Sequence, residues 1–322
     1  MKAIIRPVVK SELIKELTED KLLRHTNYAN NEIYIFTAHD SPNLMREVGR
    51  LRELTFRSAG GGTGKEIDID HFDTCENPYN QLIVWDPKDK EIVGGYRYFD
   101  CSEVVYDENG IANVATSELF KFSDKFKKDY MPYTIELGRS FVQPEYQMKS
   151  NSRKGLYALD NLWDGLGAIV VHYPEVKYFF GKVTMYTSYN QYARDLLLFF
   201  LQQNFTDHEK LVEPIKPLKI EVEHRHFDQI FTGETYKENY KVLSQEVRNL
   251  KENVPPLINA YMNLSPTMKV FGTAINDEFG GVEETGIIIT IEDIYQIKKE
   301  RHLNFRRLGA FIRSKIKRRS KK

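Results

Sequence analysis

LRELTFRSAGGGTGKEIDIDHFD, residues 51–73, is the part of the sequence that best indicates how this chain folds. Its first seven residues continue a predicted helix that begins after Ser41, because the following Pro42 suits a first helical turn and a serine suits the cap. Apolar side chains recur along this helix at helical spacing, at Leu44, Val48, Leu51 and Leu54. The glycines and alternating acids that follow show little periodicity, so residues 58–80 are predicted to form a loop.

Short strands and helices follow this loop. Residues 81–86 and 91–99 are predicted to form a hairpin around a Pro-Lys-Asp-Lys turn, and residues 133–142 form a strand that ends before Pro144. The other expected elements are a strand at 31–38, a helix from about 150 to 172, a strand at 176–185, a helix at 190–203, a polar helical segment at 204–262, and strands at 268–275 and 285–291. The helix from about 150 is expected to bury Leu156, Leu159, Trp163, Leu166 and Val170.

Composition narrows the class of protein. The chain has 322 residues, of which 41% are hydrophobic and 29% are charged, as in a globular protein with a sizeable core. Its apolar runs are shorter than the roughly 18 residues that a membrane-spanning helix needs. Its two cysteines, Cys75 and Cys101, lack metal-ligand spacing, so we expect a reduced, cytoplasmic setting and no metal site.

The net charge of zero conceals an asymmetry between the body and the C-terminus. Residues 298–322 contain 12 bases and one acid, which leaves 34 bases and 45 acids in residues 1–297. Apolar residues recur at helical spacing within this tail, at Leu308, Phe311, Ile312 and Ile316. Such a tail could lie on an anionic membrane surface, dock an acidic carrier protein, attract nucleic acid loosely without specificity, or remain a solvated extension.

The strand at 133–142 carries Glu136 and Arg139. On a regular strand these two side chains would face opposite sides, because their separation is odd. A β-bulge near Gly138 would bring them to one face. The alternative is an ordinary surface ion pair on an edge strand.

Five short motifs occur in an order that resembles one family. They are L-R-x-x-x-F at Leu51, Arg52 and Phe56, D-x-F-D at Asp70, Phe72 and Asp73, G-G-Y-R at Gly94 to Arg97, S-E-L-F at Ser117 to Phe120, and E-x-x-R at Glu136 and Arg139. Together they resemble the acyl carrier protein-dependent N-acyltransferases that make ornithine and glycine lipids, often called hemolysin-like, and more distantly the acyl-homoserine-lactone synthases. The element order of residues 31–295 is similar to the fold of the GNAT superfamily. This resemblance implies that the strand at 133–142 separates from its neighbour at a bulge, which would leave backbone N–H groups free to stabilise an oxyanion.

The resemblance implies roles for particular residues. Glu136 would be the general base and Arg139 its catalytic partner, and the acceptor amino acid would be held by Arg52, Asp70, Asp73 and Arg97. Alternatively, the aspartates simply pair with the arginines. The donor's phosphopantetheine arm would lie against Phe141, Val142, Lys149, Arg153, Lys154 and Gly155. This loop has one glycine where GNAT enzymes usually have two, which suits a donor with a single phosphate better than the pyrophosphate of coenzyme A.

Taken together, we expect an α/β (α+β) fold with a mixed, mostly antiparallel, GNAT-like sheet flanked by helices. The expected organisation is one domain at 1–297, with a helical insertion at 204–262 that caps the acyl chain, and a basic tail at 298–322. The implied activity is transfer of a fatty acyl group, plausibly 3-hydroxylated, from acyl carrier protein or acyl-CoA to the α-amine of glycine or ornithine, without a bound cofactor. The enzyme would be cytoplasmic or peripheral on the inner face of the membrane. The rival functions are acetyl-CoA-dependent acetylation of a small amine and a non-catalytic, hemolysin-like membrane interaction.

Overall fold

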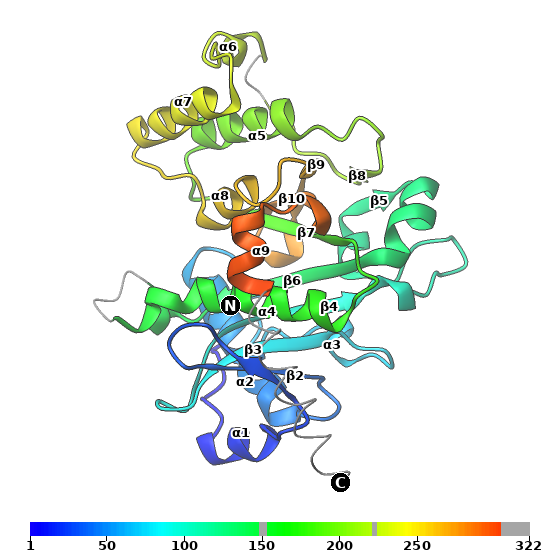
Figure 1. Cartoon of the computed structure of the whole chain (residues 1–322), viewed down its shortest axis with the longest axis vertical. Helices are drawn as coiled ribbons and strands as arrows, with labels where there is room; N and C mark the ends of the chain where they lie inside the picture. The colour runs from blue at the N-terminus through cyan, green and yellow to red at the C-terminus, as the bar shows by residue number, and fades with distance from the viewer. Residues whose placement is uncertain (148–152, 221–223, 304–322) are drawn as a thin grey trace.

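The computed structural model describes residues 1–147, 153–220 and 224–303, and it is built around one eight-stranded sheet (Figure 1). The strand order is β1-β2-β3-β4-β6-β7-β10-β9; β6 and β7 are parallel, and the other neighbours are antiparallel. A two-stranded sheet, β5-β8, lies beside it. The predicted mixed, mostly antiparallel sheet is therefore confirmed. The strands are β1 (Leu22–His25), β2 (Glu32–Phe36), β3 (Asn80–Asp86), β4 (Glu91–Asp100), β5 (Phe120–Phe122), β6 (Thr134–Val142), β7 (Tyr178–Met185), β8 (Val212–Pro214), β9 (Lys269–Asn276) and β10 (Val282–Thr290).

Helices cover both faces of the main sheet. One face packs against α2 through a core that includes Leu44, Val48 and Trp85. The other face packs against α4 and α5 through a larger core that includes Leu82, Ile169 and Leu196. The α-helices are α1 (Lys10–Glu16), α2 (Pro42–Ser58), α3 (His71–Thr74), α4 (Ala158–His172), α5 (Gln191–Phe205), α6 (His224–Asp228), α7 (Tyr236–Asn249), α8 (Pro256–Met262) and α9 (Gln296–Leu303).

The predicted helix at residues 42–58 is present, but its cap differs from the prediction. Pro42 occupies the first turn as expected, whereas the side chain of Ser41 makes no capping hydrogen bond. The carboxylate of Glu16, at the end of α1, instead accepts hydrogen bonds from the backbone N–H groups of Asn43 at 3.1 Å and Leu44 at 2.8 Å. A contact between residues so far apart in sequence leaves no local signature.

The strand at 134–142 contains the predicted bulge. Gly138 pairs with Arg97 and Phe141 pairs with Gly95, so two residues of β6, 139 and 140, oppose the single residue between them on β4. The unusual backbone angle falls on Arg139, at φ 51°, rather than on the neighbouring glycine. The extra residue shifts the alternation of every side chain that follows it on this strand.

β6 and β7 separate beyond this point. Their pairing ends at Leu137 opposite Gly181, whereas β7 continues to pair with β10 as far as Met185. The sheet therefore opens between its two central strands next to the bulge, as the GNAT resemblance implied.

Of the stripe predicted for the helix that follows β6, Leu166 is buried and Trp163 and Val170 pack half-buried against the core, but Leu156 and Leu159 do not. Residues 153–157 form a 3₁₀ helix, η6, and the α-helix begins only at Ala158. Leu156 and Leu159 are consequently 59% and 51% exposed, while Leu162 and Leu166 are buried. The prediction was wrong at these two residues because a 3₁₀ turn has three residues rather than 3.6, so a stripe extrapolated back through it loses its phase.

The segment at 204–262 contains α6, α7 and α8, as predicted, and also the short strand β8, which was missed. Of the C-terminal region, α9 is described and packs on α4, where Nδ1 of His302 lies 2.8 Å from the Asp164 carboxylate. Residues 304–322, including Leu308, Phe311, Ile312 and Ile316, lie outside the described residues. Within the described parts of the chain, no helix is long and apolar enough to cross a membrane.

Candidate active site

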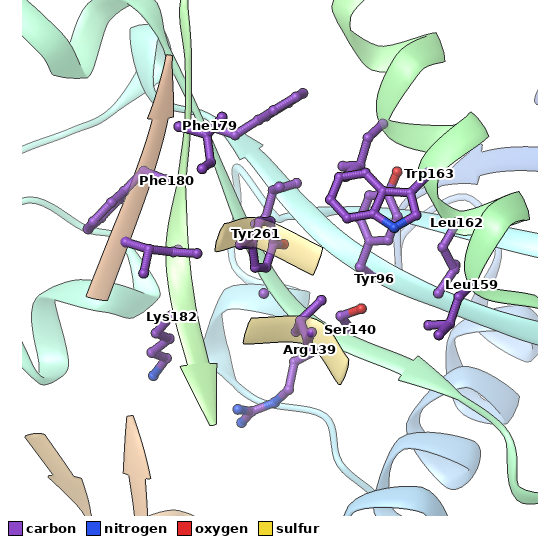
Figure 2. Close-up of a pocket in the computed structure, with 17 residues that line it drawn as sticks. Tyr96, Arg139, Ser140, Leu159, Leu162, Trp163, Phe179, Phe180, Lys182 and Tyr261 are labelled. Atoms are coloured by element: carbon purple, nitrogen blue, oxygen red, sulfur yellow. The ribbon is translucent and has the colours of Figure 1, made fainter. Parts of the chain in front are cut away.

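The opening between β6 and β7 forms the mouth of an apolar cavity of about 700 Å³, mouth included (Figure 2). Its walls come from β4, β6, β7, β10, α4 and α8. Figure 2 shows the charged ends of Arg139 and Lys182 extending to one end of this cavity, away from Trp163. The main apolar side chains of the wall are Tyr96, Leu137, Leu159, Leu162, Trp163, Leu166, Phe179, Leu257, Tyr261, Ile287 and Ile289.

A buried ion-pair cluster lies on the face of the sheet that α2 covers. Arg52 and Asp73 are both fully buried, and Arg52 Nη1 lies 3.2 Å from each oxygen of Asp73. Arg97 lies 3.1 Å from Asp73 and 2.6 Å from Asp70. Burial alone would raise the pKa of Asp73, but the charges of Arg52 and Arg97 outweigh it and hold that pKa well below its usual range. The alternative interpretation, in which the aspartates pair with the arginines, therefore describes this geometry.

Arg139 joins the same cluster because the bulge turns it toward this face. Its guanidinium lies 3.0 Å from Asp68 and 3.5 Å from Asp70, and it stacks 4.3 Å from the ring centroid of Phe279. Asp68 is fully buried, and burial raises its pKa despite the neighbouring arginines. Sequence reasoning missed Asp68, although the D-I-D alternation at residues 68–70 was a signal that it could have used.

Glu136 is only 2% exposed, and both of its carboxylate oxygens are engaged. One accepts a short hydrogen bond from the hydroxyl of Tyr79, and the other accepts the backbone N–H of Thr116 at 2.8 Å. The Tyr79 oxygen in turn accepts the backbone N–H of Ala115 at 2.9 Å. Burial raises the pKa of Glu136. The structure thus joins Glu136 to the charged cluster through Tyr79, whose ring lies 4.9 Å from the Arg97 guanidinium.

The residues expected to bind the donor are divided between the two faces. Val142 packs on the cavity side, but Phe141 is 3% exposed and packs in the core beneath α2. The Phe141 side chain points away from the cavity because the bulge at residues 139–140 moves residue 141 to the charged face together with Arg139, so a contact of this residue with the donor stays a prediction that only its backbone could meet.

The loop that leads into α4 is described in part. A β-carbon on Gly155 would lie 2.2 Å from the carbonyl oxygen of Tyr146, so glycine is required there for close packing of the loop on itself. Lys149 lies outside the described residues, as do the side chains of Arg153 and Lys154. Their expected contact with a phosphate stays a prediction.

A further cation at the cavity mouth was also missed by sequence reasoning. Lys182 Nζ lies 2.7 Å from Glu284, which is 3% exposed and also accepts hydrogen bonds from Thr184 and Asn276. Burial would raise the pKa of Glu284, but the Lys182 charge lowers it. Lys182 had no motif to identify it, since only the parallel pairing of β6 with β7 brings it beside the mouth. In the described parts of the chain, no group of three or more His, Cys, Asp or Glu is arranged to hold a metal ion.

Sequence and structure comparisons show which known proteins this chain is similar to. Residues 51–154 match the acetyltransferase (GNAT) domain family. A glycine N(alpha)-acyltransferase of Phocaeicola vulgatus is 56% identical over 303 residues, which are 94% of this chain and 93% of the relative. A second glycine N(alpha)-acyltransferase, from Bacteroides thetaiotaomicron, is 57% identical over 94% of this chain and 90% of the relative. Among solved structures, the AHL synthase LasI overlaps 47% of this chain and 71% of its own, with 16% identity and a TM-score of 0.33.

Proposed function

Because the chain belongs to the family of the glycine N(alpha)-acyltransferases, and is an acyltransferase with a GNAT fold, we propose that it transfers a fatty acyl group from a carrier thioester to the α-amine of glycine. The product would be an N-acylglycine, an early intermediate of an aminolipid. The donor we favour is acyl carrier protein, with acyl-CoA as the alternative.

The observation that best supports a fatty acyl donor is the apolar cavity that opens between β6 and β7. Its wall is lined by apolar side chains from β4, β6, β7, β10, α4 and α8, which suits a hydrocarbon chain. Leu257 and Tyr261 of α8 form part of its wall, which suits the predicted role of the 204–262 segment as a cover for the acyl chain. An acetyl group would leave most of this apolar surface unfilled, so the cavity favours a long chain over an acetyl donor.

The charged face supports an amino-acid acceptor. Arg97 and Arg139 present guanidinium forks that can bind a carboxylate, and Asp70, whose side chain is 27% exposed, lies between them. Arg52 and Asp73 are fully buried, so we assign them the task of positioning Arg97 and Asp70 rather than touching glycine. The thioester carbonyl would lie at the separation of β6 and β7, where backbone N–H groups beside the bulge can stabilise its oxyanion.

The experiment is a transfer assay with purified protein and isotopically labelled glycine. Acyl carrier protein charged with long-chain and acetyl groups, and the matching acyl-CoA thioesters, are each offered, and labelled amide is identified by mass spectrometry. We expect N-acylglycine from the long-chain carrier thioester. Ornithine and serine serve as competing acceptors. Absence of long-chain amide with every donor, or efficient transfer of acetyl alone, would refute the proposal.

Peripheral membrane association is a separate part of the proposal and rests on the charge of residues 298–322. The structure suggests where to cut the chain, since α9 is anchored by His302 to Asp164 and should be kept. We expect the full chain to sediment with anionic liposomes, and a chain ending at Leu303 to sediment much less. Equal sedimentation of the two would contradict a membrane role for the tail.

A further inference from the structure

The S-E-L-F motif at residues 117–120 has no role in the site described so far, although the structure places it across the cavity mouth. It begins within the 3₁₀ turn η2 (Ala115–Glu118) and continues into β5. Two buried groups fix the start of this turn: Glu136 accepts the Thr116 N–H at 2.8 Å, and Tyr79 accepts the Ala115 N–H at 2.9 Å. Glu136 is on β6 and Tyr79 immediately precedes β3, so both groups lie on the β6 side of the opening.

The end of the motif is fixed on the other side of the opening. A β-carbon on Gly286 would lie 3.1 Å from the ring of Phe120, so that ring packs directly on β10 at this position. Gly286 is the partner of Lys182 in the pairing of β10 with β7. Residues 115–120 therefore span from β6 to β10 over the charged face, and Glu118 lies in the middle of the span.

Glu118, like Asp277 and Glu278 in the same hollow, differs from the acids of the charged cluster and from Glu284. Asp68, Asp70, Asp73, Glu136 and Glu284 each hold an arginine, a lysine or a hydrogen-bond donor. Among the described residues, no ion pair or hydrogen bond engages the Glu118 carboxylate, and this side chain is exposed in a second hollow of about 870 Å³. It is a carboxylate that is still able to receive a proton.

We propose that Glu118 is the general base that takes a proton from the acceptor ammonium, and that Glu136 is a positioning residue that holds the turn carrying Glu118. This inference rests on the proposed transfer to glycine. It moves the base from the residue that the motif comparison suggested, because Glu136 is buried with both oxygens occupied, whereas the Glu118 carboxylate has no partner among the described residues, is exposed in a hollow on the charged face, and lies near enough to Lys182, Arg97 and Asp70 to feel their charges.

The reaction can be balanced with Glu118 in this role. Glycine arrives with three protons on nitrogen, and one of them passes to the Glu118 carboxylate. The freed lone pair attacks the thioester carbonyl carbon, so a C–N bond forms and the C–S bond breaks. The leaving thiolate takes the second proton, the third stays on the amide nitrogen, and Glu118 then releases its proton to water.

The charges around Glu118 suit such a base. Partial burial raises the pKa of Glu118, Lys182 and Arg97 oppose that rise, and Asp70 and Glu278 add to it. Lys216 and Asp277 also line its hollow. A carboxylate with a raised pKa is a stronger base, and desolvation of the bound ammonium lowers the pKa of the amine toward it.

The test uses the full chain and compares Glu118→Gln with Glu136→Gln, with Glu213→Gln on the exposed face of β8 as the matched control. For Glu118→Gln we expect kcat/KM for glycine to fall by about 10²–10⁴-fold, the usual contribution of a general base. The KM for the donor and the thermal midpoint should stay unchanged. Glu118→Asp should retain part of the activity, and Glu213→Gln should match the unmodified chain.

The pH profile separates a base from a structural residue. The unmodified chain should lose activity as pH falls through the pKa of its base, which gives the pH profile an acidic limb. Glu118→Gln should lack this limb. Its activity should recover at alkaline pH, where the free amine forms without a base from the protein. The residual activity of Glu136→Gln should keep the limb. With aminoacetonitrile, whose amine is unprotonated at neutral pH, the defect of Glu118→Gln should shrink at least tenfold.

Two results would overturn the inference: activity of Glu118→Gln within threefold of the unmodified chain, or an equal loss with both acceptors at every pH. Neither result would touch the proposed function, which fails only if the unmodified chain makes no N-acylglycine. If Glu136→Gln lost the acidic limb and Glu118→Gln kept it, Glu136 would be the general base instead.

Discussion

Replacing Asp73 by asparagine removes one charge from the centre of the ion-pair cluster while keeping the shape of the side chain. Asp73 and Arg52 are fully buried, and Arg97 is 2% exposed, so water cannot take the place of the lost carboxylate. Removing one partner of a buried pair costs about 3–5 kcal/mol, because the remaining charge stays desolvated. The Gln81 amide, which donates to Asp73 at 3.0 Å, loses its charged acceptor as well. We therefore expect the free energy of unfolding to fall by about 3–5 kcal/mol.

Urea titration followed by tryptophan fluorescence measures this change. The slope of unfolding free energy against urea should stay constant while the midpoint falls, because the surface exposed on unfolding is the same. The control is Glu12→Gln, which breaks the exposed pair of Glu12 with Lys15, where the two side chains are 42% and 68% exposed. An exposed pair contributes about 0–1 kcal/mol. If Asp73→Asn lowered the free energy of unfolding by less than about 1 kcal/mol, it would refute the view that burial makes this cluster sensitive to the loss of one charge.

The pH dependence of the same comparison has a definite sign. The pKa of Asp73 in the folded chain lies below its unfolded value, so its contribution is fully present above the unfolded pKa of about 4. The contribution is lost as pH falls through the folded pKa. The stability difference between the unmodified chain and Asp73→Asn should accordingly be constant near neutral pH and shrink below about pH 4. A difference that grows on acidification would show the opposite sign and contradict the assignment.

Three further predictions follow from the opening between β6 and β7. Leu257→Trp should fill the cavity and shift the preferred donor to shorter acyl chains, measured as the ratio of kcat/KM values for long and short thioesters. Gly181→Ala places a β-carbon 2.6 Å from the Leu137 carbonyl oxygen, so it should lower the free energy of unfolding by about 1–3 kcal/mol in urea titration and weaken transfer. Arg139→Lys should raise the KM for glycine at least tenfold with little change in kcat, since an ammonium cannot form a two-pronged contact with the acceptor carboxylate.

Much of the fold could be predicted from local patterns. The hairpin of β3 and β4, the helix after Ser41 and the strand carrying Glu136 follow from periodicity and turn chemistry, and the structure confirms them. The bulge near Gly138 could be predicted from the odd spacing of two charged residues together with the GNAT resemblance, and the structure places it at the adjacent residues 139 and 140.

What the sequence did not reveal depends on contacts between distant segments. The exposure of Leu156 and Leu159 was not predicted because the local sequence gives no sign of the 3₁₀ turn at the start of this helix. Tyr79 and Asp68 were missed for a similar reason. Tyr79 is one aromatic residue in a segment read as a loop, and it acquires a role only when folding brings it to Glu136 and to the Ala115 N–H.

The bulge in β6 explains why both substrates can meet at one point of the sheet. A non-glycine residue in the left-handed region, as Arg139 is at φ 51°, costs roughly 1–2 kcal/mol and persists only where surrounding contacts hold it. Here Asp68, Asp70 and the Phe279 ring contact its guanidinium. The extra residue turns Arg139 to the charged face and Val142 to the cavity, where the sheet opens. In the reaction that we propose, an apolar acyl chain and a charged amino acid would approach the thioester from opposite faces, and neither would have to cross the environment that suits the other.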